Sequence, residues 1–159
     1  MEPRFNFAKA APAGYKPLLA LEQYLHDCGL DQPLLHLIKF RASQINGCAY
    51  CLDMHSKDLR AIGETEQRLY SLDAWRECPY YTERERAALA WTEAVTLITH
   101  GHVPDEVYEE ARKQFNEKEI SDLTLAVATI NAWNRLAISS RTVPGAYQPA
   151  KAHESKAGA

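Results

Sequence analysis

Apolar side chains recur every three or four residues along most of this chain, which is the spacing of amphipathic helices. Thr82 followed by Glu85, and Asn116 followed by Glu119, are typical of helix starts. No stretch alternates apolar and polar residues with hairpin turns, so strands are expected to be absent or few. The pattern therefore predicts one all-α domain of about seven helices. They are expected over residues 17–28, 31–46, 48–62, 65–78, 83–99, 104–115 and 117–141.

The segments at either side of this pattern differ from it. Residues 1–16 contain Pro3, Pro12 and Gly14 and show little periodicity, so they are expected to form an extended arm. Such an arm would pack on the body or on a neighbouring subunit. Residues 17–143 are predicted to be the helical domain. Residues 144–159 are mostly small and polar and are predicted to be a disordered tail.

Composition and charge argue against several classes of protein. The 159 residues are 46% hydrophobic and 25% charged, which is close to the average of globular domains. The net charge is −3, and no basic block suggests a nucleic acid or a membrane surface as partner. No apolar run approaches the about 20 residues of a transmembrane helix. Because no apolar core of a signal peptide stands near residue 1, the expected location is the cytoplasm.

The candidate chemistry lies in "GCAYCLDMH", residues 47–55. In a reducing compartment, a close cysteine pair is more often catalytic or metal-binding than a structural disulfide. On a helix with about 100° per residue, Cys51 lies about 300° and His55 about 340° around from Cys48. The three side chains therefore share one face, which Leu52 and Leu59 make apolar. The isolated Cys28 and Cys78 are expected to be small hydrophobic residues.

Three effects act on these thiols. The helix start favours a thiolate at Cys48, and His55 can accept the proton of Cys51 one turn away, whereas burial raises thiol pKa values. A thiolate can attack a peroxide oxygen to give a sulfenic acid, and a second cysteine within reach can condense with it to a disulfide.

Other interpretations of the cysteine pair remain open. A structural zinc ion needs four ligands, and the available partners are His36 or the pair His100 and His102 in "THGHVP". Two ordinary buried cysteines are a further possibility. A thioredoxin-like domain shares the motif but requires strands, which the pattern does not predict.

The flanking sequence is more specific. The segment "LLHLIKFRASQINGCAYCLDMHSKDLRAIGE", with "TERERAALAWTEAVTLIT" and "INAWNRLAISSR", resembles the alkylhydroperoxidase D-like (AhpD-like) branch of the carboxymuconolactone decarboxylase family. The resemblance covers residues 33–143. It implies an all-α fold that assembles as trimers or larger rings of trimers. It also implies thiol-dependent reduction of hydroperoxides by a CxxC pair that cycles between dithiol and disulfide.

The resemblance assigns roles by position. Cys51 would be the attacking thiol, Cys48 the resolving thiol, and His55 a member of the proton relay. The helix dipole alone would favour Cys48 as the more acidic thiol. Well-known members carry a glutamate twelve residues before the first cysteine, where this chain has His36. A histidine can still move protons near neutral pH, but it supplies no fixed negative charge.

Glu93 is the hypothesised replacement for that glutamate. It is a charge inside an otherwise apolar helix, and such residues are rarely buried unless they are paired. In this hypothesis Glu93 reaches His55 or the cysteines. The alternatives are that it pairs with an arginine such as Arg41, or that it points to water.

The predicted function is that of a cytoplasmic, homo-oligomeric thiol peroxidase with neither metal nor organic cofactor. Its electrons would come from a dithiol donor, such as a lipoyl- or thioredoxin-type protein. Tyr50, Trp91 and Trp133 are candidates to line a pocket for an organic hydroperoxide. The alternatives are a redox-sensing or structural protein with little turnover, and a metal-binding protein that uses the CxxC pair and a histidine.

Overall fold

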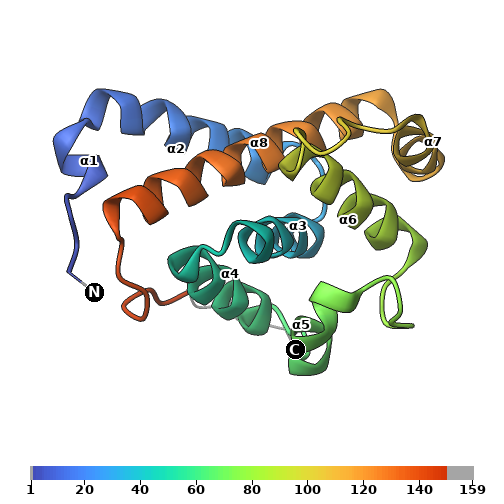
Figure 1. Ribbon diagram of the computed structural model, residues 1–159, viewed down its shortest axis with the longest axis horizontal. Helices are drawn as coiled ribbons and strands as arrows, with labels where there is room; N and C mark the ends of the chain where they lie inside the picture. Colours follow the sequence, from blue (N-terminus) through green and yellow to red (C-terminus); the bar gives the residue numbers. More distant parts are fainter. Residues whose placement is uncertain (1, 150–159) are drawn as a thin grey trace, which may run out of the picture.

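The computed structural model describes residues 2–149 and confirms the all-α fold (Figure 1). Within this range, eight α-helices and one short 3-10 helix follow one another without a strand. None of these helices is long and apolar enough to cross a bilayer. The elements are α1 (Phe7–Ala10), α2 (Pro12–Asp27), α3 (Gln32–Asn46), α4 (Ala49–Ala61), α5 (Glu66–Ser71), η1 (Leu72–Ala74), α6 (Glu83–Thr96), α7 (Asp105–Gln114) and α8 (Glu117–Ser140).

Helix α3 lies at the centre of the fold and packs against α4, α6 and α8 (Figure 1). Every residue from Leu37 to Ser43 is buried, because neighbouring helices cover α3 on several sides. Helix α2 also packs against α8. The segment from Gly47 that contains the candidate site residues follows directly from this buried central helix.

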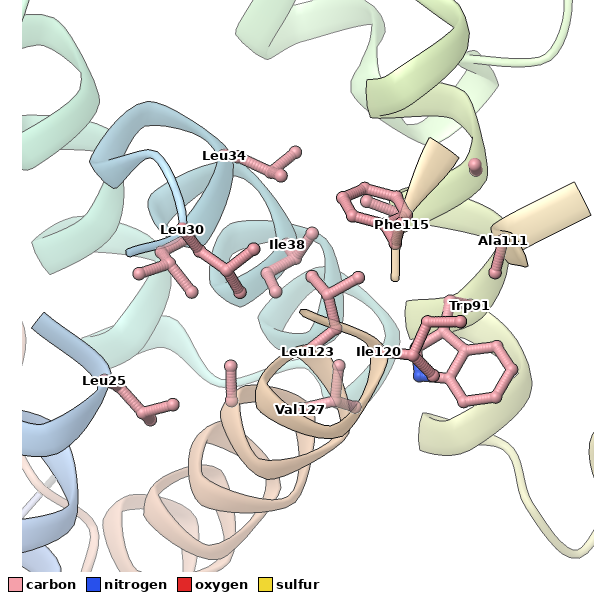
Figure 2. Packing of buried hydrophobic residues seen from close by; sticks show 14 residues of the cluster. Leu25, Leu30, Leu34, Ile38, Trp91, Ala111, Phe115, Ile120, Leu123 and Val127 are labelled. Carbon is pink, nitrogen blue, oxygen red and sulfur yellow. The ribbon is translucent and has the colours of Figure 1, made fainter. Parts of the chain in front are cut away.

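The main hydrophobic core joins α2, α3, α6, α7 and α8 (Figure 2). Leu25, Ile38 and Leu123 are fully buried in it, and Trp91 and Phe115 fill the side toward α6 and α7. A second cluster packs α3, α4 and α6 against α5 and η1. A third and smaller cluster contains Cys48 and Cys51 together with Ala42 and Ile130. The cysteine pair is therefore part of the packed interior.

The predicted helix starts are confirmed where the signal is local. Thr82 with Glu85 and Asn116 with Glu119 form complete capping boxes at α6 and α8. In each box the side-chain oxygen of the cap residue accepts from the backbone N–H of the glutamate, and the glutamate accepts in return. Asp31 stands at the start of α3, but its side chain makes no capping hydrogen bond.

The segments before and after the predicted domain are more structured than expected. The helix predicted from Pro17 begins at Pro12, so the arm expected over residues 1–16 contains α1 and the first turns of α2. A proline is well tolerated at the first helical position because its missing N–H has no intrahelical partner there. The predicted disordered tail is described as far as residue 149, and Gly145 and Tyr147 contact α4. Residues 150–159 lie outside the described range.

Candidate active site

The cysteine pair occupies the turn between α3 and α4. Gly47 ends α3 with a φ of 67°, in the left-handed region that glycine adopts at low cost. Cys48 is the N-cap of α4, and its Sγ accepts the N–H of Cys51 at 3.3 Å. The two sulfurs are within disulfide-bonding distance, and the Cα atoms are 5.4 Å apart. The helix predicted to start at the first cysteine is therefore confirmed.

A buried polar network fixes this turn against α8. The side-chain amide of Asn46 donates to the side-chain oxygens of Asn131 and Asn134, at 3.0 and 2.8 Å. Asn134 is fully buried and donates in turn to Ser43 Oγ at 3.0 Å. The backbone N–H of Cys48 donates to the carbonyl oxygen of Ser43, also at 3.0 Å. Because buried polar groups need partners, this network specifies the position of the turn rather than packing alone.

A cavity of about 630 Å³ opens beside the pair. Cys51 contributes to its wall, whereas Cys48 does not. Most of the wall is apolar or aromatic, and its charged or titratable groups include His36, His55 and Asp58. Tyr50 and Trp133 line the cavity as predicted, but Trp91 lies in the main core, where its indole N–H donates to Thr124.

The outer wall of the cavity comes from two segments that are far apart in the sequence. Phe5 and Phe7 come from the segment before α2, and Thr142 and Val143 follow α8. The backbone N–H of Arg4 donates to the carbonyl oxygen of Ser140 at 2.9 Å. This bond fastens the segment before α2 to the end of α8, where the second segment begins. The cavity is thus bounded by both segments and by the faces of α2, α3, α4 and α8.

Two histidines approach each other in this cavity. His55 lies one turn after Cys51 on α4, and His36 comes from the neighbouring α3; their ring centroids are 5.8 Å apart. His55 is 4% exposed, and neither of its ring nitrogens has a hydrogen-bond partner. The Nδ1 atom of His36 is likewise buried and unbonded. A buried polar group without a partner costs about 1–3 kcal/mol, so this arrangement is unfavourable unless water, a ligand or a substrate in the cavity completes it.

Asp58 is the acidic residue of this site. Its Oδ2 atom lies 3.8 Å from Nδ1 of His36 and 3.8 Å from Nδ1 of His55. Its other oxygen, Oδ1, accepts the phenolic O–H of Tyr147 at 2.6 Å. The carboxylate is therefore held in place from the far side, and it faces both histidines with one free oxygen.

Burial favours the neutral form of both histidines. It lowers the pKa of His55 well below the usual value, and the positive charge of Lys39 and the neighbouring His36 add to this effect. Burial also lowers the pKa of His36, although Asp58 opposes the change. A neutral imidazole has a nitrogen lone pair that can accept a proton or bind a metal ion.

Lys39 is a buried cation near the histidines, and a carboxylate compensates its charge. Its Nζ donates to Glu22 Oε2 at 2.5 Å, and the indole N–H of Trp133 donates to Oε1 of the same carboxylate at 2.9 Å. Glu22 and Lys39 both line the cavity. This chain of contacts ties α2, α3 and α8 together at the polar end of the cavity.

The hypothesis that Glu93 reaches His55 or the cysteines is wrong. Its carboxylate accepts from Arg41 Nε at 2.8 Å, from the indole N–H of Trp75 at 2.9 Å and from Arg76 at 2.5 Å. Glu93 is not part of the cavity wall. The structure shows the alternative, in which Glu93 pairs with an arginine, here Arg41. Glu93 is charged inside an apolar helix because two arginines and a tryptophan satisfy it.

Sequence reasoning missed Asp58 and Tyr147. Asp58 was within reach of the same helical projection, because it lies three residues after His55 and about 280° around from Cys48. Tyr147 gave no comparable signal, because it belongs to a segment without periodicity and acts only through tertiary contact.

The zinc alternative is not supported in residues 2–149, where the one group with metal-ligand geometry contains His36, His55 and Asp58 but no cysteine.

The sequence profile of the carboxymuconolactone decarboxylase family matches residues 12–94, just over half of the chain. This chain belongs to that family. Its AhpD-like character agrees with the solved structures of similar proteins described below. The uncharacterized protein YdfG of Bacillus subtilis (strain 168) is 44% identical over 139 residues, which are 87% of this chain and 95% of YdfG.

Solved structures of similar proteins share the fold. A protein of unknown function from Agrobacterium tumefaciens, for which a role in antioxidant defence as AhpD has been suggested, is 45% identical, with a TM-score of 0.88 over 92% of this chain and all of the other. The debrominase Bmp8 is 18% identical, with a TM-score of 0.75 over 87% of this chain and 74% of the other. At that identity Bmp8 shows the fold alone, and its name indicates that the fold serves more than one chemistry.

Proposed function

We propose that this AhpD-like protein reduces organic hydroperoxides with the dithiol of Cys48 and Cys51. The observation that carries the proposal is the cavity of about 630 Å³, in which Cys51 and His55 share one wall while Cys48 lies behind Cys51 within bonding distance. A cavity with an aromatic wall suits an organic hydroperoxide better than it suits a small polar peroxide.

The reaction begins at Cys51. His55 accepts the thiol proton, and the resulting thiolate attacks one oxygen of the hydroperoxide, so that an S–O bond forms and the O–O bond breaks. The leaving alkoxide takes the proton from His55 and departs as an alcohol. Cys51 is then a sulfenic acid. The thiol of Cys48 attacks its sulfur, which forms the disulfide and releases water.

The assignment of Cys51 as the attacking thiol rests on two arguments. The resemblance to AhpD-like proteins assigns it by position, and Cys51 is the cysteine with access to the cavity. The helix-dipole argument favours Cys48. Both cysteines are buried in the same packed cluster, at 1% and 2% exposed, but Cys48 does not line the cavity. Access of the peroxide outweighs the modest dipole effect, which is typically about 0.3–1 kcal/mol.

His55 acts as the base, and His36 and Asp58 support it. Asp58 favours the tautomer of His55 that carries its proton on Nδ1, because the carboxylate lies on that side of the ring. The Nε2 atom is then left as the acceptor. His36 is the second proton carrier, and Asp58 replaces the negative charge that His36 itself cannot supply.

The test is consumption of an organic hydroperoxide by the purified protein with a dithiol as the reductant. The variants Cys48→Ser and Cys51→Ser should each lose turnover, whereas the matched controls Cys28→Ser and Cys78→Ser should keep it, since both are free cysteines outside the site. Trapping with dimedone should label Cys51 in Cys48→Ser and should label nothing in Cys51→Ser. A wild-type protein that is no faster than Cys51→Ser would refute the peroxidase.

One result would support the redox-sensing alternative instead. If peroxide oxidises the pair stoichiometrically but added dithiol gives no second turnover, the disulfide is a signal rather than a catalytic intermediate.

The proposed reductant is a lipoyl- or thioredoxin-type dithiol protein, which fits a location in the cytoplasm where thiols are kept reduced. The proposed assembly is a homo-oligomer, a trimer or a hexamer, which light scattering in solution would measure.

A further inference from the structure

The buried polar atoms without partners gather in one place. Among the described residues 2–149, three buried side-chain nitrogen or oxygen atoms lack a hydrogen-bond partner, and all three belong to His36 and His55. Native proteins satisfy nearly all such atoms, so a cluster of exceptions indicates a missing partner. Both rings border the cavity, from which such a partner can enter.

The cluster has the chemistry and size of a metal site. One ligand atom each from His36, His55 and Asp58 can be chosen so that all three lie within 4.8 Å of one another. Two of the three contacts, from Asp58 Oδ2 to each Nδ1, are 3.8 Å. Ligand atoms about 2.0–2.2 Å from a tetrahedral ion are about 3.3–3.5 Å apart. To close the site, the two 3.8 Å contacts would shorten by about 0.3–0.5 Å, and the third, which is within 4.8 Å, by at most about 1.5 Å.

We propose that His36, His55 and Asp58 bind a divalent transition-metal ion of the zinc class, with an open coordination position toward the cavity. Two imidazoles and one carboxylate suit zinc and its neighbours in the first transition row, whereas magnesium and calcium prefer oxygen ligands. The site differs from the zinc site that the cysteine spacing suggested, because neither cysteine is a ligand.

The surroundings support the site and also oppose it at one point. Tyr147 donates to the second oxygen of Asp58 at 2.6 Å, which is the kind of outer hydrogen bond that orients a ligating carboxylate. Lys39 is the opposing charge, and it is neutralised by Glu22 at 2.5 Å. Because the disulfide removes both thiols as ligands, the oxidised protein offers only the two imidazoles and the carboxylate in this cluster.

Metal binding would also regulate the proposed reaction. An ion bound to Nδ1 of His55 moves the ring proton to Nε2, so Nε2 could no longer accept the thiol proton, and the ion would inhibit peroxide reduction. This consequence rests on the proposed function. The binding itself does not, and it can be measured without any turnover.

The experiment uses the full chain in its disulfide form after treatment with a chelator. Titration with Zn²⁺ should show one site, and Co²⁺ should give the visible spectrum of a four- or five-coordinate site with nitrogen and oxygen ligands. A hundredfold excess of Zn²⁺ over the dissociation constant should raise the melting temperature by about 5–10 °C.

The variants His36→Ala and Asp58→Asn should weaken Zn²⁺ binding about tenfold or more and lose the thermal shift. The matched control His26→Ala removes an exposed histidine beside Asp27 and should change neither. Circular dichroism checks that each variant is folded. If His36→Ala does not fold, Asp58→Asn, which keeps the shape of the side chain, still tests the site. The proposal is overturned if the wild type binds no ion, or if either folded variant binds it as tightly as the wild type.

Discussion

Substitution of Glu93 tests whether this residue stabilises the fold without taking part in the chemistry of the cavity. The substitution Glu93→Gln keeps the shape of the side chain and removes its charge. The Glu93 side chain is 14% exposed and Arg41 is 11% exposed, so their ion pair is largely shielded from water. Arg76 is 60% exposed, so its pair with Glu93 contributes little.

The expected loss follows from these contacts. A hydrogen bond to a charged group contributes about 1.5–3 kcal/mol, and Arg41 keeps Gln44 and Asp73 as partners after the substitution. We expect Glu93→Gln to lower the free energy of unfolding by about 2–3 kcal/mol. For a chain of this length, that corresponds to a fall of about 4–12 °C in melting temperature, which calorimetry measures. The control Glu109→Gln, at an exposed position of α7, should change it little.

The dependence of this effect on pH is equally specific. Burial alone would raise the pKa of Glu93, but hydrogen bonds from Trp75, Arg76 and Arg41 outweigh it and hold the pKa below its usual 4.5. A carboxyl whose pKa is lowered by folding stabilises the protein above its unfolded pKa and loses that contribution as the pH falls through the folded value. The difference between the wild type and Glu93→Gln should therefore narrow below about pH 4.5.

Two results would refute this reasoning. One is a difference in stability that stays constant from pH 7 to pH 3. The other is a shift in the pH profile of alkylation of Cys51 in the reduced Glu93→Gln variant, because the structure places Glu93 outside the cavity and so predicts an unchanged profile.

Three further substitutions test the parts that hold the site. Gly47→Ala should destabilise the protein by about 1 kcal/mol in urea unfolding; since a Cβ there meets no atom within 4 Å, an effect near zero would remove the argument from backbone conformation. Asn134→Ala should cost about 1–3 kcal/mol, because Ser43 loses its buried partner, and an unchanged unfolding midpoint would contradict the network. Tyr147→Phe should cost about 1 kcal/mol and speed amide hydrogen exchange at residues 145–147, and exchange equal to that of the wild type would show that the Asp58 contact does not hold this segment.

The sequence predicted most of what is local in this fold. The capping boxes of α6 and α8 and the start of α4 at Cys48 depend on side chains within four residues of one another, so periodicity and capping rules located them. The grouping of Cys51 and His55 on one face followed from helix geometry in the same way. These features need no knowledge of how the helices pack.

Features that depend on packing were beyond such rules. From the sequence, Glu93 could reach His55 or the cysteines, pair with an arginine, or point to water. Only the arrangement of α3, η1 and α6 decides in favour of Arg41 and Trp75. Tyr147 approaches Asp58 across 89 residues of chain. The early start of α2 was missed because Pro12, Gly14 and Pro17 weaken the helical signal, whereas tertiary contact with α8 supports the helix.

The enclosure of the cavity has a consequence for how this protein can diversify. Part of its wall comes from residues 3–8 and 142–143, and helix α1 contributes no buried residue to the core. Substitutions in these segments reshape the space that a substrate must enter while the packing of α3 against α4 and α8 stays intact. Selection, or a library of variants, can therefore change which molecules reach Cys51 without first compensating for lost stability.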